Sequence, residues 1–400
     1  MPGPLSGCRV IELSHIMAGP VCGLMLADMG ADVVKVEKPA GDDTRRFLPP
    51  DIYGESAAFM MMNRNKRGIV LDLTKKGGKR ALLRLVKDAD VLIENYRKGT
   101  MEKLELGYDV LRAENPGLIY TELSGFGRTG PYAERGGFDL IAQGMSGLMS
   151  ITGEDAGRPP VKVGAPISDI TAGILAAMGV AAAYAHKLKT GEGQKVDTSL
   201  FEAAITQTYW QSAIAFATGE APGPMGSAHP LNAPYQAFET ADGWINVGAA
   251  NQKNWETFIQ IINAEHLGRD SRFLDNSGRI TNRLALANEL HAIMRKRSTD
   301  DWLKAFEDGG LPAGPVLDVK EMHADPQAIA RSMVPSVEHP VAGEVQTLGL
   351  PVKFSRTPGD VNRPAPLLGQ HTTEILKEAG FSQGEIATLL DTGAALQTGP

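Results

Sequence analysis

The segment CRVIELSHIMAGPVCGLMLADMGADVVKVE, residues 8–37, contains the pattern that decides the fold. Its two ends, CRVIEL (8–13) and DVVKVE (32–37), are short and mostly apolar, which predicts buried strands. Between them, residues 19–30 are rich in small and apolar side chains and predict a helix. The order strand, helix, strand predicts one unit of an α/β fold with a parallel sheet.

The same alternation continues along the next ninety residues. Further strands are predicted at GIVLDL (68–73), DVLIEN (90–95) and GLIYTELSGFG (117–127). The segment KKGGKRALLRLVKDA (75–89) has helical spacing and connects two of them. Five strands alternating with helices indicate a parallel sheet that is covered on both faces.

A second, smaller domain is expected later in the chain. The segment 218–234, TGEAPGPMGSAHPLNAP, is dense in Pro and Gly and is interpreted as a linker. After it, YQAFETADGWINVG (235–248) has an Asp-Gly turn between two alternating segments, which predicts a β-hairpin. Helical patterns follow at 251–263, 280–297 and 299–308, the last preceded by a capping Ser298. These patterns predict a large domain over 1–217, completed by 326–400, and a small α+β domain over 235–325.

Composition limits the class of protein. The chain has 400 residues, a formal net charge of −7, 42% hydrophobic residues and two cysteines. These values are typical of a soluble globular protein in a reducing compartment, and we expect a cytoplasmic location. An acidic chain argues against nucleic-acid binding, and the longest uncharged apolar run, 170–185, is shorter than the ~20 residues of a membrane span.

Several common site motifs are absent from the sequence. The turn SHIMAGPVCG (14–23) after the first strand is not the G-x-G-x-x-G of dinucleotide-binding proteins, and G-x-x-x-x-G-K-[ST] does not occur. The eight histidines are far apart and form no metal-ligand motif, so we expect no protein-built metal site. No G-x-S-x-G is present either.

Basic residues follow the predicted strands. Lys38 follows the second strand, and Arg97 and Lys98 follow the fourth. Because ligands bind at the carboxyl ends of parallel strands, these cations could converge on a ligand that carries several phosphates. The alternative is a solvated surface, which spacing alone favours.

The segment GAPISDITAGILAAMG, 164–179, has a single ionisable side chain, Asp169. One interpretation is an N-cap, because Asp is preferred there. The other is a covalent nucleophile, since the amide groups at a helix start keep a carboxylate ionised and stabilise a nearby oxyanion. From the residues alone the cap is preferred.

Ordered segments along the whole chain resemble those of the class III CoA-transferases, the family of formyl-CoA transferase and the carnitine and bile-acid CoA-transferases. The likeness rests on HIMAGPVCGLMLADMGADVVKVEKPAGDDTR, NRNKRGIVLDL, DVLIENYRKGTMEKLELGYD, SGFGRTGPYAERGGFD, ISDITAGILAA, KTGEGQKVDTSLFEA and PAPLLGQHTTEIL. The resemblance implies a large Rossmann-like domain that binds CoA, with no permanently bound cofactor. It also implies a homodimer whose chains interlock like linked rings.

The resemblance further implies roles for individual residues. Asp169 corresponds to the nucleophile, which would form an acyl-aspartyl anhydride and then an aspartyl-CoA thioester. Residues expected to line the thiol end and the substrate pocket are His15, Met17, Ala18, Phe138 and Asp139. Residues expected to hold the nucleotide and phosphates of CoA are Lys38, Lys66, Asn95, Tyr96, Arg97 and Lys103.

The substrates are narrowed by differences within the family. Formyl-CoA transferases have Gln where Met17 stands, and a glycine run where this chain has VGAANQKNW (247–255). The α-methylacyl-CoA racemases share the fold but place a catalytic His where Phe138 stands. The segment GSAHPLNAPYQAFETADGWINVGAANQ (226–252) is most similar to succinyl-CoA:glutarate CoA-transferases. We therefore expect CoA transfer from an acyl-CoA to a dicarboxylate, with a racemase and a non-catalytic acyl-CoA-binding protein as alternatives. Which of Arg45, Arg46 or His229 receives a second carboxylate stays open.

Overall fold

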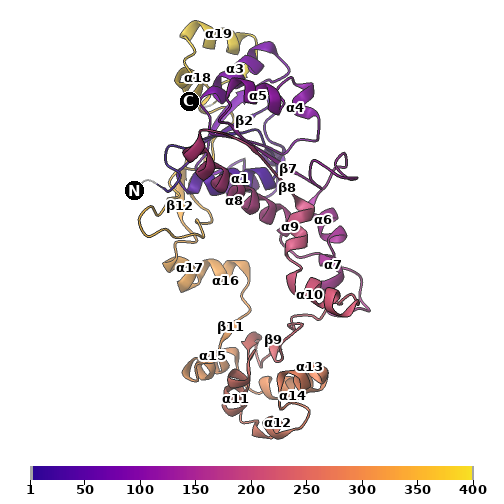
Figure 1. Ribbon diagram of the computed structural model, residues 1–400. Helices are drawn as coiled ribbons and strands as arrows, with labels where there is room; N and C mark the ends of the chain where they lie inside the picture. Colours follow the sequence, from indigo (N-terminus) through magenta and orange to yellow (C-terminus); the bar gives the residue numbers. More distant parts are fainter. Residues whose placement is uncertain (1–2, 399–400) are drawn as a thin grey trace. The chain divides into compact units, whose positions relative to one another are not determined.

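The computed structural model describes residues 3–398 (Figure 1). The chain forms two compact units. Unit 1 contains the described residues up to 146, together with 163–207 and the chain from 326 onward. Unit 2 contains 147–162 and 208–325, so the segment 147–162 packs with the residues of the expected small domain.

Unit 1 is built on a seven-stranded sheet with the order β14-β5-β2-β1-β6-β7-β8. The strands, in that order, are Ala395–Leu396, Arg67–Leu71, Asp32–Glu37, Arg9–Glu12, Val91–Glu94, Ile119–Ser124 and Lys195–Ser199. All neighbours are parallel except β14, which runs antiparallel to β5. The five predicted strands are confirmed, and the six parallel strands have the order 3-2-1-4-5-6 of a doubly wound sheet.

The strands β8 and β14 were not predicted. In β8, Lys195–Ser199, charged and partly exposed residues replace the apolar pattern, because β8 lies at an edge of the sheet. The strand β14 has two residues, too few for a periodic signal.

Helices cover both faces of this sheet (Figure 1). On one face, α3 (Lys76–Lys87), α5 (Tyr108–Glu114), α18 (Thr372–Glu378) and α19 (Gln383–Asp391) bury leucines and isoleucines against the strands. On the other face lie α1 (Ala18–Asp28) and the long α8 (Ile167–Thr190), which pack against each other. The remaining elements of unit 1 are η1 (Asp43–Arg46), β3 (Asp51–Ile52), β4 (Glu55–Ser56), α2 (Ala57–Asn63), α4 (Thr100–Lys103), α6 (Asp139–Met145), α9 (Leu200–Thr206), α17 (Pro326–Ala330), β12 (Ser336–His339) and β13 (Gly343–Gln346).

Helix α8 is the one helix among residues 3–398 that is long and apolar enough to cross a membrane. It has 24 residues, more than the 170–185 run, because it continues through Lys187 and Lys189. Its small side chains are buried against α1, α9, β7 and β8. This packing is that of a core helix in unit 1.

Unit 2 contains the predicted hairpin, β9 (Tyr235–Glu239) and β10 (Trp244–Gly248), and a third strand, β11 (Ala313–Pro315). Its core is formed by aromatic residues of the hairpin and of α11 (Gln252–Ile261) and α15 (Thr299–Asp308). The predicted cap is confirmed, because the Ser298 side chain accepts the amide of Asp301. Other helices of unit 2 are α7 (Leu148–Ile151), α10 (Tyr209–Thr218), α12 (Glu265–Arg269), α13 (Asn276–Thr281), α14 (Arg283–Met294) and α16 (Val319–Ala324).

Two details of unit 2 differ from the expectations. The single helix predicted over 280–297 is divided at Asn282, whose side-chain amide donates to the carbonyl of Gly278 at 2.9 Å. The described residues 219–234 of the expected linker contain no helix or strand, but the C-terminal end of this segment is held by a hydrogen bond. The buried Arg279 donates from Nε to the carbonyl of Ala233 at 2.6 Å.

Candidate active site

The strand order of unit 1 reverses between β1 and β6, which defines a topological switch point. The connections after these two strands lead to opposite sides of the sheet, and in such sheets ligands bind at the carboxyl ends of the strands beside the switch point. The turn after β1 contains His15 and Met17, and the turn after β6 contains Asn95, Tyr96 and Arg97. The structure thus brings five of the expected site residues to one edge of the sheet.

The two turns are joined directly. The Asn95 side chain accepts the amide of His15 at 2.9 Å and donates to the carbonyl of His15 at 2.8 Å. The rings of His15 and Tyr96 lie 5.6 Å apart, and burial lowers the pKa of His15. Asn95 therefore orders the turn through its backbone.

The expected nucleophile lies beside the start of α1. A Cβ placed on Gly173 of α8 would lie 2.6 Å from the carbonyl oxygen of Ala18, so these helices touch at the first residue of α1. Asp169 precedes Gly173 by four residues and shares its face of the helix. Its side chain leans toward the N-terminus of α8.

Asp169 is not the N-cap. Helix α8 begins at Ile167 after Pro166, so Asp169 is the third helical residue. The cap comes instead from Asp139 at the start of α6, whose Oδ1 accepts the amide of Ser168 at 2.9 Å. The capping interpretation is therefore wrong for Asp169, because a carboxylate from another helix serves this end.

Asp139 also changes the acidity of the nucleophile. Burial and, to a smaller extent, the negative charge of Asp139 together raise the pKa of Asp169 to about 7. At neutral pH part of the molecules therefore have a protonated Asp169. The expectation that the helix start keeps this carboxylate ionised is wrong for that part. Desolvation and a second carboxylate outweigh the helix dipole here.

A glutamine that the sequence analysis missed supports Asp139. The Gln143 amide donates to Oδ2 of Asp139 at 2.7 Å and accepts the amide of Val163 at 2.9 Å. Phe138, which precedes α6, is 74% exposed. A Cβ on Gly125, after β7, would lie 2.7 Å from Cα of Gly137, so the loop carrying Phe138 and Asp139 is packed onto the end of β7.

The expected CoA-binding cations fall into two groups. Lys38 and Arg97 are exposed in the loops after β2 and β6, and Lys103 is exposed at the end of α4; all three could reach phosphates. The side chain of Lys38 is 57% exposed and pairs with Asp43 at 3.0 Å.

Lys66 differs from the expectation of a phosphate ligand. It is fully buried, and its Nζ lies 2.8 Å from Glu12, 2.8 Å from the carbonyl of Pro20 and 3.0 Å from Asn63. Its donors are used inside unit 1, so it stabilises the base of the site. Three residues, Arg45, Arg46 and His229, were candidates to bind a second carboxylate. Arg45 is now the least available of them, because its Nε and Nη2 both donate to Glu37.

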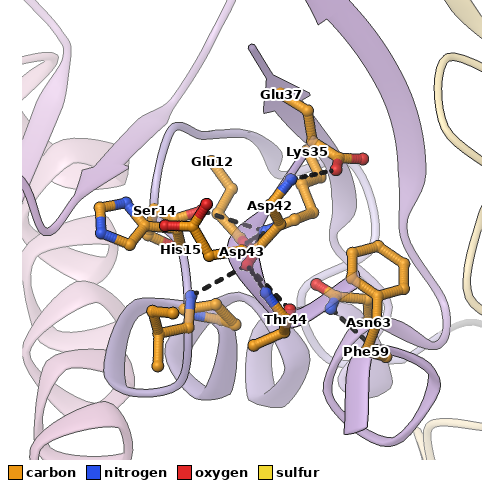
Figure 2. Close-up of polar contacts among 12 residues, drawn as sticks. Glu12, Ser14, His15, Lys35, Glu37, Asp42, Asp43, Thr44, Phe59 and Asn63 are labelled. Carbon is orange, nitrogen blue, oxygen red and sulfur yellow. Dashed lines mark hydrogen bonds and ion pairs between the residues drawn. The ribbon is translucent and has the colours of Figure 1, made fainter. Parts of the chain in front are cut away.

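Sequence reasoning also missed the buried charges beneath the turn, shown in Figure 2. Lys35 contacts Glu12 at 3.2 Å and Asp42 at 2.9 Å, and all three side chains are shielded from solvent. A signal was present, since Glu12 and Lys35 are charges of opposite sign that lie among apolar residues of the first two strands. In the sheet they are directly paired.

Among residues 3–398 no group of three or more His, Cys, Asp or Glu side chains is arranged to hold a metal ion. The site has a carboxylate near the amides at a helix start. The carboxylate can attack a carbonyl, and the amides can stabilise the resulting oxyanion.

Comparisons with known proteins identify the family of this chain. The family model described as CoA-transferase family III matches residues 5–372. A succinate–glutarate CoA-transferase of Agrobacterium fabrum is 40% identical over 94% of this chain and 95% of its own length. A succinyl-CoA:mesaconate CoA-transferase of Haloarcula hispanica is 40% identical over 96% and 98%. The chain belongs to CoA-transferase family III and is an enzyme of that class.

A solved structure is similar over nearly the whole chain. The crystal structure of a CAIB/BAIF family protein from Brucella suis has a TM-score of 0.85 and 39% identity, covering 95% of this chain and 100% of the other.

Proposed function

We propose that this protein transfers CoA from an acyl-CoA, such as succinyl-CoA, to a dicarboxylate through covalent intermediates on Asp169. The observation that carries the proposal is the position of Asp169 on α8, one helical turn from Gly173, where α8 touches the first residue of α1. The named substrates of the 36–40% identical relatives support the dicarboxylate.

The reaction balances in four steps. A carboxylate oxygen of Asp169 attacks the thioester carbonyl, the C–S bond breaks, and an anhydride and CoA thiolate form. The thiolate attacks the Asp169 carbonyl, giving an aspartyl thioester and the free donor acid. The acceptor carboxylate then attacks this thioester and releases CoA thiolate. Finally the thiolate attacks the acceptor's acyl carbonyl, giving the new acyl-CoA and regenerating Asp169.

The surrounding residues support this sequence. A carboxylate with a pKa of about 7 is a stronger nucleophile than an ordinary Asp, and it remains partly ionised at neutral pH. The amides of Ala18 and Gly19 at the start of α1 can stabilise the tetrahedral oxyanion, because the first amide groups of a helix have no partner within it. Pro20 has no amide hydrogen, and the amide of Val21 is bonded to the carbonyl of Met17. The exposed Lys38, Arg97 and Lys103 are proposed to bind the phosphates of CoA. Phe138 cannot exchange protons, which disfavours a racemase.

The test is Asp169→Asn with succinyl-CoA and a panel of dicarboxylates. We expect at least a thousandfold loss of CoA transfer, on the order of the effect of removing other covalent nucleophiles. Intact-protein mass spectrometry should show an acyl or CoA adduct on the wild type and none on the variant. Full CoA exchange by a folded Asn variant would refute the covalent role.

The same variant has a predictable stability. Because the folded-state pKa of Asp169 is raised to about 7, its contribution to stability is full below about pH 4 and is lost as the pH rises through 7. Asp169→Asn should therefore melt at or above the wild-type temperature at pH 8. This separates lost chemistry from lost folding.

We also propose a homodimer in the cytoplasm. In unit 1, exposed apolar side chains gather on α6 and α8, namely Leu140, Ile141, Met145, Ile174 and Met178. In unit 2, α10 exposes Tyr209, Trp210 and Phe216. Surfaces of this kind mark protein interfaces, and light scattering during size-exclusion chromatography should report twice the chain mass. A reducing compartment is supported by the free, buried Cys8 and Cys22.

A further inference from the structure

The turn that enters α1 has an unusual backbone. Ile16 has a φ of 67°, in the left-handed region that β-branched residues avoid. Such a conformation is strained and persists only when the surrounding structure imposes it. Something other than the local sequence must therefore hold residues 14–17.

Side chains from outside the turn bind four of its backbone groups, and Figure 2 shows Lys35 and Asp42 among them. The Lys35 Nζ donates to the carbonyl of Ser14 at 3.0 Å, and Asp42 Oδ1 accepts the amide of Ile16 at 3.3 Å. Asn95 binds both backbone groups of His15. Lys35, Asp42 and Asn95 thus bind the backbone of three consecutive residues, 14–16.

The buried charges beneath the turn balance one another. Lys35 lies between Glu12 and Asp42, and Lys66 pairs with the other oxygen of Glu12. Although burial opposes ionisation, the ion pair with Lys35 lowers the pKa of Asp42, and Glu12 and Asp42 raise the pKa of Lys35. Buried ion pairs often give little net stability compared with apolar residues. A role in fixing geometry accounts for them better.

The geometry that they fix lies next to the nucleophile. The turn determines where α1 begins, and Ala18, its first residue, touches Gly173 one helical turn from Asp169. We propose that Lys35 and Asp42 are positioning residues, which hold the strained Ile16 turn so that the first amides of α1 face the carbonyl that reacts with Asp169. This rests on the proposed function of Asp169.

The inference predicts rescue by relief of strain. Asp42→Asn removes the charge that pairs with Lys35, so Ile16 should relax toward negative φ and displace the start of α1. A displacement of about 1 Å can cost about a hundredfold in rate, and we expect a loss of that order in kcat with the KM for the acyl-CoA nearly unchanged. Glycine adopts positive φ without strain. The double variant Ile16→Gly, Asp42→Asn should therefore regain at least about tenfold of the loss in kcat.

If Asp42→Asn lowered kcat only by destabilising the fold, adding Ile16→Gly should not restore kcat, because glycine increases the entropy of the unfolded chain and so lowers stability. Melting temperatures of all variants are measured beside kcat, and Asn263→Gly serves as the matched control. Asn263 also has positive φ, 53°, but lies in the turn after α11 in unit 2. Adding Asn263→Gly to Asp42→Asn should restore nothing.

A folded Asp42→Asn variant with wild-type kcat, or a loss that Ile16→Gly does not reduce, would overturn the inference. If Asp42→Asn does not fold, Thr44→Val takes its place, since it removes only the hydroxyl that donates to Asp42 Oδ1 at 2.8 Å. The expected loss is then a few-fold, again reduced by Ile16→Gly. Wild-type protein without any adduct on Asp169 would refute the proposed function instead, so the two failures are distinguishable.

Discussion

Lys35 and Lys38 stand three residues apart at the end of β2, but they belong to different regions of the molecule. The Lys35 side chain is fully buried between Glu12 and Asp42, whereas the Lys38 side chain is 57% exposed and pairs only with Asp43. The first region holds the backbone turn before α1, in the proposed active site. The second offers exposed cations to a ligand.

This difference matches two tasks of one site. A reacting carbonyl needs donors fixed before it arrives, because reorganisation during the reaction costs rate. Phosphates on a long, flexible ligand need only attraction, which exposed charges supply over several ångströms of solvent. The buried region should therefore affect stability and kcat, and the exposed region should affect KM.

The largest expected contrast concerns stability. Lys35→Met keeps the length of the side chain but leaves Glu12 and Asp42 with less compensation, which should cost about 3–5 kcal/mol of the free energy of unfolding. Lys38→Met should change that free energy by no more than about 0.5 kcal/mol. Urea denaturation of both variants measures the difference. Equal effects would remove the distinction between the two regions.

A second prediction sharpens the role of Asp139, which is half-buried at the start of α6. Its charge raises the pKa of Asp169, and only the ionised Asp169 attacks, so the wild-type rate should rise with pH through about 7. Asp139→Asn should move this midpoint downward by up to about one unit, which is tenfold in the ionised fraction at low pH. The measurement is single-turnover adduct formation between pH 5 and 9.

The control for that experiment is Gln143→Leu. It removes the donor to Asp139 but keeps the Asp139 charge, so it should slow the reaction without moving the midpoint. A midpoint that is the same in wild type and Asp139→Asn would show that burial alone sets the acidity of Asp169.

The smallest expected effects concern the exposed cations. Single alanine substitutions of Lys38, Arg97 or Lys103 should raise the KM for acyl-CoA by up to about fivefold, since an exposed ion pair contributes at most about 1 kcal/mol. The effect should shrink as salt is added, while kcat stays constant. Lys66→Met should behave differently and lower stability, because Lys66 binds Glu12 inside unit 1. If Lys66→Met changed only KM, its assignment to the base of the site would be incorrect.

The sequence predicted the sheet of unit 1 well because buried parallel strands leave a simple signal. The strands at 32–37, 91–94 and 119–124 are apolar runs between loops, and the hairpin in unit 2 has an Asp-Gly turn. It failed where the signal depends on distant partners. A short edge strand such as β14 exists only because β5 is there to pair with it.

The site shows the same division. The residue types and the family resemblance pointed to Asp169, His15 and Asn95 before any coordinates. Spacing could not show that Lys66 is buried and Lys38 exposed, because each lysine lies directly beside a strand. Lys38 follows β2 and Lys66 precedes β5. Nor could it show that Asp139, thirty residues before Asp169, supplies the cap of α8.

The sequence by itself determined the alternation of strands and helices, the isolated carboxylate at the start of a small-residue helix, and the family. These are properties of neighbouring residues along the chain, which periodicity and motif spacing record. Only the tertiary structure decided the acidity of Asp169, the strain at Ile16 and the side chains that hold it. Those depend on burial and on side chains brought together from β1, β2, α6 and the loops after β2 and β6, and desolvation in a folded core has no counterpart in the linear chain.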